Sequence, residues 1–170
     1  MAEWDRDTPW RQGNLLGSDA IEALKLRYPE SQEETLVVVA THDCDLAQPP
    51  DAEPRIDVVV GKLADKNGNY AHAKSARRLH VEFTGAASFW AEFDAIAKTS
   101  IAKTDLLPFL PRTDAHLTPE NHATFQMWLA SRYRRSAFPD EFERRLTQET
   151  KLGEKIAKAI KPHGDLIAGV

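Results

Sequence analysis

The pattern of apolar and polar positions predicts four β-strands. Residues 35–41 are mostly β-branched and apolar at consecutive positions, which is typical of a strand buried on both faces and predicts a central place in a sheet. A proline-rich loop separates this segment from residues 55–61, which have the same character and would pair with it in antiparallel fashion. Residues 79–84 alternate between apolar and polar, as in a strand with one buried face. Residues 89–98 also alternate; their apolar spacing suits a helix as well, and we predict a strand.

Helical spacing indicates a short helix at 19–27 and longer helices toward the C-terminus. Ser18 is a candidate N-cap for the short helix. Thr118 and Pro119 are residue types that favour an N-cap and a first helical position. The apolar residues that follow predict a buried stripe made of Phe125, Trp128 and Leu129. A further helix is expected from Pro139 onward.

Because the strands come first and the helices later, we predict an α+β fold. Residues 1–112 would form a small, partly open β-barrel or bent antiparallel sheet with the short helix at 19–27 inserted. Residues 113–170 would form a helical extension. Residues 165–170 are typical of the beginning of a strand, so we expect the chain to be a fragment or one half of a split protein.

The composition fits a folded domain and excludes several classes of protein. The chain has 170 residues, of which 42% are apolar and 28% charged, which argues against a disordered, collagen-like or membrane-spanning chain. The formal net charge of -4 gives no general attraction to nucleic acid or to membranes, and we expect no membrane partner. Cys44 is the single cysteine, and the N-terminal segment has no secretory pattern, so we expect a reducing, cytoplasmic location. The histidines lack zinc-ligand spacing, and we expect no metal and no cofactor.

The charges are unevenly distributed along the chain. Acidic residues predominate in residues 1–60, whereas basic residues predominate in 62–78 and 132–161. If the chain contacts a polyanion, these two basic segments are the candidates. The expected phosphate contacts are Lys74, Arg77, Arg78, Arg132, Arg134 and Arg135. The arginines at 132–135 would equally suit a helix C-terminus, a surface for a protein partner, or a solvated helix.

Polar residues follow directly after the most apolar predicted strand, where a strand end could face a pocket. If the extended geometry continued, His42 and Cys44 would point to one side and Thr41, Asp43 and Asp45 to the other. A cysteine thiolate assisted by an imidazole would be a nucleophile, and two carboxylates could hold Mg²⁺ with a substrate phosphate. The alternatives are that Cys44 fills the core and that the two aspartates form a turn.

The segment 10–16, the strand that ends in Thr41, and the following strand at 56–61 together resemble the PemK/MazF-type toxins over residues 10–62. Members have an RxGD-like opening and a strand that ends in Ser or Thr. The resemblance implies a small SH3-like barrel and metal-independent RNA cleavage. It matches Arg11 to the basic residue of the opening motif and Thr41 to the catalytic hydroxyl. This chain has Asn14 where the family usually has Asp.

From these observations we expect a nucleic-acid-interacting module with RNA-cleaving activity, in a toxin–antitoxin or phage-defence setting. Its candidate catalytic residues are Arg11, Thr41, Asp43, Cys44 and Asp45. The alternative is a non-enzymatic adaptor that binds a partner chain through its C-terminal helices. Phosphate contacts would make binding depend steeply on salt, whereas burial of apolar surface would not.

Overall fold

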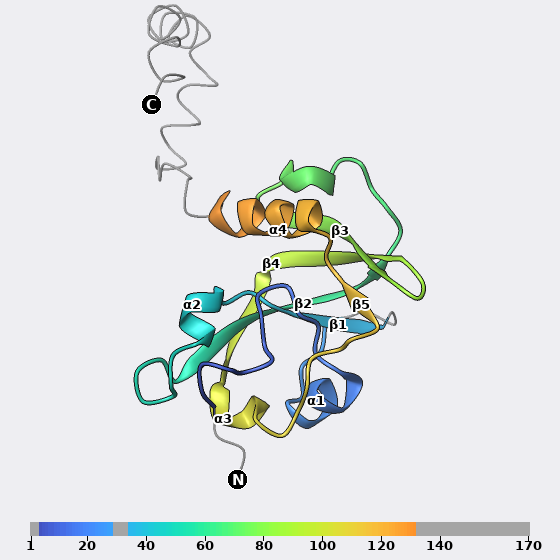
Figure 1. Ribbon diagram of the computed structural model, residues 1–170. Helices are drawn as coiled ribbons and strands as arrows, with labels where there is room; N and C mark the ends of the chain where they lie inside the picture. Colours follow the sequence, from blue (N-terminus) through green and yellow to red (C-terminus); the bar gives the residue numbers. More distant parts are fainter. Residues whose placement is uncertain (1–3, 29–33, 132–170) are drawn as a thin grey trace, which may run out of the picture. The chain divides into compact units, whose positions relative to one another are not determined.

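The computed structural model of the protein describes residues 4–28 and 34–131 (Figure 1). In this part of the chain, five antiparallel strands form one sheet in the order β1-β2-β4-β3-β5. The strands are β1 (Thr35–Val39), β2 (Arg55–Ala64), β3 (Arg78–Gly85), β4 (Phe89–Ala102) and β5 (Ala115–His116). The four predicted strands are confirmed, and the ambiguous segment that begins at Phe89 is a strand. The α+β class is confirmed as well.

β1 is buried on both faces, but the prediction that it is central in the sheet is wrong. Val37 and Val38 point to opposite faces and are both fully buried, although β1 is the last strand at one edge of the order. The segment 13–16 covers its outer side: Gly13 N donates to Val39 O, and Leu16 N donates to Val37 O, each at 2.9 Å. An irregular N-terminal segment therefore takes the place of a neighbouring strand.

The chain after α3 (Lys103–Leu106) brings the two edges of the sheet together. Arg112 N donates at 2.9 Å to the carbonyl oxygen of Leu15, which belongs to the segment that covers β1. A few residues later β5 pairs with the end of β3, through Ala115 and Gly85. The sheet is therefore a partly open barrel, as predicted.

The barrel bends sharply where β2 and β4 pair. Val59 pairs with Lys98, whereas Gly61 pairs with Phe93, so the register shifts between these positions. A Cβ atom at position 61 would lie 2.4 Å from Glu92 O and 2.4 Å from a carbon of the Phe93 ring. Only glycine allows the two strands to approach this closely, which makes Gly61 the residue that permits the bend.

Apolar side chains from the sheet form two clusters. Alternate residues of β1 belong to different clusters, Leu36 and Val38 to one and Val37 and Val39 to the other. The first cluster includes Phe125 and Trp128 of α4 (Pro119–Ser131). The second includes residues of α1 (Ser18–Ala23), α2 (Asp43–Leu46) and α3. Both faces of the β1–β2 region are therefore buried, and apolar burial of this kind is the main stabilising contribution to a small domain.

Within residues 4–28 and 34–131, four α-helices and one short 3-10 helix surround the sheet. They are α1 (Ser18–Ala23), α2 (Asp43–Leu46), α3 (Lys103–Leu106), α4 (Pro119–Ser131) and η1 (Ala71–Ala73). The helix predicted at 19–27 is present but shorter, and its N-cap is Gly17 and not Ser18. The predicted start of α4 is confirmed, because Thr118 Oγ1 accepts a hydrogen bond from Asn121 N at 3.3 Å. The helix expected from Pro139 lies outside the described residues.

Residues 113–131, assigned to the helical extension from the sequence, contribute β5 to the sheet and α4 to the first apolar cluster. In the part of the chain that the structure describes, no helix has the length and apolar character that a membrane crossing requires.

Candidate functional site

The polar segment after β1 turns immediately into α2. His42 is the N-cap of this helix, and its Nδ1 atom accepts a hydrogen bond from Cys44 N at 3.4 Å. The backbone is helical from Asp43 onward, so the extended geometry on which the alternation of side chains along 41–45 depended does not continue. The arrangement of Asp43 and Asp45 proposed for Mg²⁺ depended on that extended geometry and is lost with it.

Thr41 connects the end of β1 to the start of β2. Its Oγ1 atom accepts from Asp57 N at 2.6 Å, and Thr41 N donates to Asp57 O at 3.2 Å. A backbone N–H needs a partner when it is shielded from water, and the threonine hydroxyl provides it here. The hydroxyl that the resemblance assigns to catalysis is thus engaged in holding the two strands together.

The guanidinium of Arg11 lies against the backbone of its own turn. Nη1 donates to Thr8 O at 2.5 Å and to Trp10 O at 2.8 Å. Asn14 stabilises the same turn, because its Oδ1 atom accepts from Arg11 N at 2.6 Å. Within the described residues, no hydrogen bond or ion pair joins Arg11 to Thr41.

Cys44 is exposed, so the interpretation of this residue as part of the core is wrong. Its Sγ atom lies 3.1 Å from His42 Nδ1 and 3.4 Å from Asp45 Oδ1. The hydrogen bond to the Asp45 carboxylate raises the pKa of the Cys44 thiol above its ordinary value. A nucleophilic cysteine needs a lowered pKa, so this environment favours the unreactive thiol form.

Lys103 holds α2 in place from inside the molecule. The side chain is fully buried, and Nζ donates to Asp45 O at 2.6 Å and to Gln48 O at 2.8 Å. Nζ also lies 5.6 Å from the centre of the Trp4 ring. Burial lowers the pKa of Lys103, because removal from water disfavours the charged form. Lys103 is not among the residues predicted from the sequence, although it follows the apolar Ile101 at the two-residue spacing of one strand face.

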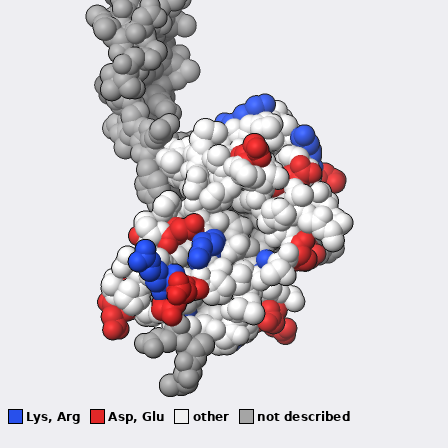
Figure 2. Space-filling model, viewed as in Figure 1, with Lys and Arg blue, Asp and Glu red and all other residues white. Residues whose placement is uncertain are grey.

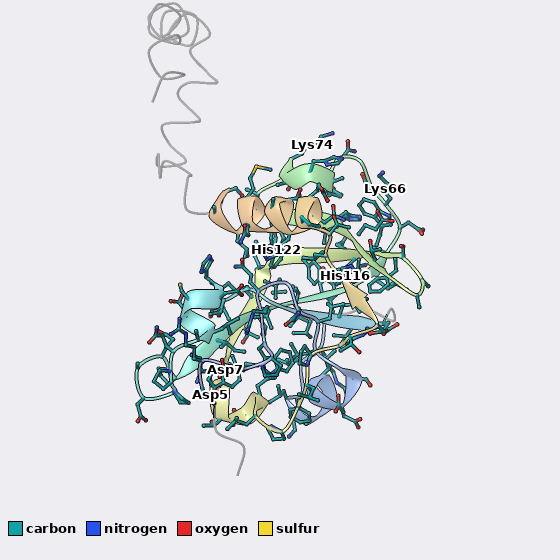
Figure 3. All side chains as sticks on the ribbon, viewed as in Figure 1. Asp5, Asp7, Lys66, Lys74, His116 and His122 are labelled. Carbon is teal, nitrogen blue, oxygen red and sulfur yellow. The ribbon has the colours of Figure 1, made fainter. Side chains whose placement is uncertain are left out.

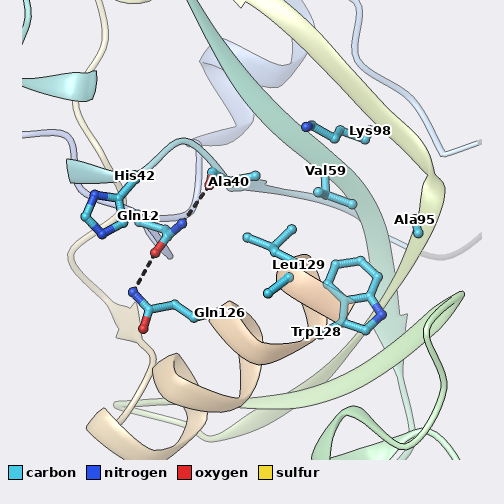
Figure 4. A pocket seen from close by; sticks show the side chains of 10 residues that line it. Gln12, Ala40, His42, Val59, Ala95, Lys98, Gln126, Trp128 and Leu129 are labelled. Atoms are coloured by element: carbon cyan, nitrogen blue, oxygen red, sulfur yellow. Dashed lines mark hydrogen bonds between the residues drawn. The ribbon is translucent and has the colours of Figure 1, made fainter. Parts of the chain in front are cut away.

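A pocket of about 390 Å³ lies beside this segment, next to α4 (Figure 4). Val59, Ala95, Trp128 and Leu129 line it from one side, and Gln12, His42 and Gln126 gather at the other (Figure 4). None of the five predicted catalytic residues belongs to the described part of this lining. His42, their neighbour in the sequence, does line the pocket.

Three of the six predicted nucleic-acid contacts lie in the described part of the chain. Lys74 and Arg77 are exposed on the connection between β2 and β3, and Lys74 Nζ donates to Gly68 O at 3.2 Å. Figure 3 shows Lys74 at the same end of the molecule as Lys66. Arg78 begins β3. The other three, Arg132, Arg134 and Arg135, lie outside the described residues.

Arg78 belongs to a set of side chains on the outer face of the sheet that the sequence did not reveal. The cross-strand pairs Lys62–Glu92 and His80–Glu92 place these residues side by side. Trp90 lies two positions from Glu92 on the same face, because side chains alternate along a strand. We call these five residues, Lys62, Arg78, His80, Trp90 and Glu92, the polar sheet face.

Glu92 is the electrostatic centre of the polar sheet face. Its carboxylate lies 2.8 Å from His80 Nε2, 3.8 Å from Arg78 Nη1 and 3.9 Å from Lys62 Nζ. His80 Nδ1 donates to Asp65 O at 2.9 Å, because a carbonyl oxygen can only accept. With both ring nitrogens engaged, His80 serves to hold Glu92 and the loop after β2 in place.

Three cations on this side of the sheet lie over aromatic rings. Lys66 Nζ is 4.9 Å from the centre of the Trp90 ring, and the Arg78 guanidinium carbon is 5.1 Å from that of Tyr70. Lys62 Nζ lies 5.7 Å from the centre of the Tyr28 ring. Burial, together with the carboxylate of Glu92, raises the pKa of the Tyr28 hydroxyl. A groove of about 630 Å³ is lined in part by Lys62, Lys66, Trp90 and Glu92.

No cluster of three or more His, Cys, Asp or Glu side chains suited to a metal ion occurs within residues 4–28 and 34–131. No family model, no curated protein and no solved structure matches the chain. The relationship to PemK/MazF-type toxins therefore stays a prediction, and the function has to be argued from the geometry of the sites themselves.

Proposed function

We propose that this protein binds single-stranded nucleic acid, and RNA in particular, along the groove of the polar sheet face. The observation that carries the proposal is the set of three cation–aromatic pairs on this side of the sheet, Lys66 with Trp90, Arg78 with Tyr70, and Lys62 with Tyr28, of which Lys66, Trp90 and Lys62 line the groove. Aromatic side chains on a sheet surface stack with unpaired bases, and neighbouring lysines and arginines attract the phosphates between those bases.

The charges on this surface determine how the binding should respond to salt. Lys62 and Arg78 are partly neutralised by Glu92, which leaves the exposed Lys66, Lys74 and Arg77 as phosphate contacts. Three contacts to a single strand predict a slope of about −2 in a plot of log affinity against log salt concentration. Affinity should therefore fall roughly 20-fold between 50 and 200 mM salt, and stacking on Trp90 should provide much of the rest.

Binding can be measured by fluorescence anisotropy with a labelled 12-nucleotide oligouridine RNA and the matching DNA. Trp90→Ala should weaken binding by roughly 5- to 160-fold, since loss of one stacked base costs about 1–3 kcal/mol. Trp90→Phe should keep most of the affinity. Lys66→Gln should flatten the salt slope by about 0.7, whereas Lys25→Gln, an exposed lysine after α1, should leave it unchanged. Absence of binding at 50 mM salt, or equal affinity in Trp90→Ala, would overturn the proposal.

RNA cleavage and a toxin or defence role rest on the resemblance alone. Both side chains that the resemblance assigns to catalysis, Arg11 and Thr41, are hydrogen-bonded to backbone groups of the fold. Our proposal therefore stops at binding. We place the protein in the cytoplasm, where a free, exposed thiol such as that of Cys44 stays reduced.

The alternative is an adaptor that binds a partner chain through its C-terminal helices. The observation in its favour is Met127, which is 52% exposed on α4 although it is a large apolar residue. Burial of apolar surface changes little with salt, so the salt titration above separates the two functions.

A further inference from the structure

We propose that the pocket beside α4 is a second binding site and that it takes a small aromatic carboxylate. This site is independent of the polar sheet face, since the described linings of the pocket and of the groove have no residue in common. Its volume of about 390 Å³ lies within the range of roughly 300–1,000 Å³ that is typical of small-molecule sites. Apolar side chains line one end of the pocket and polar groups line the other, and this division indicates the kind of ligand that fits.

One end of the pocket suits a flat apolar ring. Val59, Trp128 and Leu129 provide the lining, and Val59 and Trp128 are almost completely buried. These side chains belong to, or pack against, the first apolar cluster, which holds their positions. Aromatic ligands gain from contact with an indole ring and branched aliphatic groups in addition to the area that they bury.

The other end of the pocket provides oriented hydrogen-bonding groups (Figure 4). Gln126 Nε2 donates to Gln12 Oε1 at 2.8 Å, and Gln12 Nε2 donates in turn to Ala40 O at 2.7 Å. This chain fixes both amides, so that they are ordered before a ligand arrives. Each amide nitrogen has a second hydrogen, which has no acceptor among the described residues.

His42 adds a third donor at this end. Its Nδ1 atom accepts from Cys44 N, so the proton of the neutral ring lies on Nε2. Lys98 also lines the pocket, with its ammonium 2.7 Å from the Asp57 carboxylate, and no Asp or Glu appears in the described lining. The Asp57 carboxylate that pairs with Lys98 and the Asp43 carboxylate that accepts from Gln12 N both lie outside the described lining. The described lining itself therefore offers donors and no carboxylate, which favours an anionic head group over a cationic one.

The test uses three probes of nearly the same shape: phenylacetate, phenylacetamide and phenethylamine. Isothermal titration calorimetry or ligand-observed NMR on the full chain should give a Kd for phenylacetate on the order of 0.1–1 mM, as expected for a ligand of this size. The neutral amide should bind several-fold more weakly than the carboxylate, and the amine should show no saturable binding.

Variants on α4 distinguish this pocket from other surfaces. Gln126→Ala should weaken phenylacetate binding roughly tenfold, because it removes one donor and frees Gln12. Leu129→Trp should fill the apolar end and abolish binding; its thermal unfolding shows whether it remains folded. Met127→Ala, an exposed position on the same helix, serves as the matched control. The proposal is overturned if the unmodified chain does not bind phenylacetate, if phenethylamine binds as tightly, or if Gln126→Ala binds with unchanged affinity.

Discussion

Polar side chains at the end of β1 form hydrogen bonds with backbone N–H groups. Thr41 accepts from Asp57 N, Asp43 Oδ1 accepts from Gln12 N at 2.7 Å, and the His42 ring caps α2. Such residues are preferred at turns and N-caps because their side chains satisfy N–H groups that regular structure leaves open. The most reactive atom left exposed in this segment is Cys44 Sγ.

The reactivity of Cys44 should be controlled by Asp45. Since the carboxylate raises the pKa of the thiol, the thiolate fraction at neutral pH is smaller than for an ordinary cysteine, and it rises as the pH increases. Asp45→Asn removes the negative charge and should accelerate reaction with a disulfide probe at pH 7 by roughly two- to tenfold. Its rate profile should shift to lower pH. Asp51→Asn, an exposed aspartate in the following loop, should leave the rate unchanged; an unaltered rate in Asp45→Asn would contradict the assigned cause.

At the scale of the elements, the bend between β2 and β4 gives the sheet its barrel form. β4 is long enough to pair with both halves of β2, and the register shift at Gly61 separates the two pairing regions. The face that carries Lys62 and Glu92 lies directly after this shift. The close approach at Gly61 thus helps to position the polar sheet face.

Gly61→Ala should lower the free energy of unfolding by about 1–3 kcal/mol, because the new methyl group would overlap Glu92 O and the Phe93 ring. Urea denaturation followed by circular dichroism measures the difference in the free energy of unfolding between this variant and the unmodified chain. Gly68→Ala is the matched control, since a Cβ atom at position 68 would have no neighbour within 4 Å and should change stability by less than about 0.5 kcal/mol. Equal stability of the two variants would mean that the approach of the strands tolerates a side chain.

The strands were predictable from the sequence because alternation and β-branched runs are local properties, as at 79–84. The start of α4 was predictable for the same reason, through Thr118 and Pro119. The edge position of β1 was not predictable, since β1 is buried there only because residues 13–16 pair with its outer side. The pairing of Lys66 with Trp90 was equally hidden, because it requires the register of β2 against β4.

The net charge of -4 for the whole molecule does not indicate how charge is distributed over any single surface. The face in Figure 2 shows basic and acidic groups interspersed, without an extended region of one sign. Several cations are paired locally, such as Arg112 with Asp114 at 2.6 Å and Lys98 with Asp57 at 2.7 Å. Recognition of a polyanion by this protein would therefore depend on a few exposed cations and on stacking, not on a general attraction.

Lys103 makes the stability of the fold depend on pH in the alkaline range. Its amine contacts the carbonyls of Asp45 and Gln48 and the ring of Trp4. Burial lowers its pKa from 10.5, and this effect outweighs the opposing effect of the Glu53 and Asp45 carboxylates, which raise the pKa. Below the lowered pKa both the folded and the unfolded chain carry the charge, and the cost of burying it is fully present. Between that pKa and 10.5 the unfolded chain binds more protons than the folded one, so this contribution to stability increases with pH.

We therefore expect the free energy of unfolding of the unmodified chain, relative to Lys103→Met, to increase as the pH rises from the lowered pKa of Lys103 toward 10.5. Urea unfolding of both proteins across this range measures it, and the other lysines and the tyrosines cancel in the difference because both chains contain them. Lys25→Met replaces an exposed lysine, and its free energy of unfolding should differ from that of the unmodified chain by an amount that does not change with pH. A flat or falling difference for Lys103→Met would show that the ammonium is better stabilised by its two carbonyl partners than by water, and that its pKa is not lowered by burial.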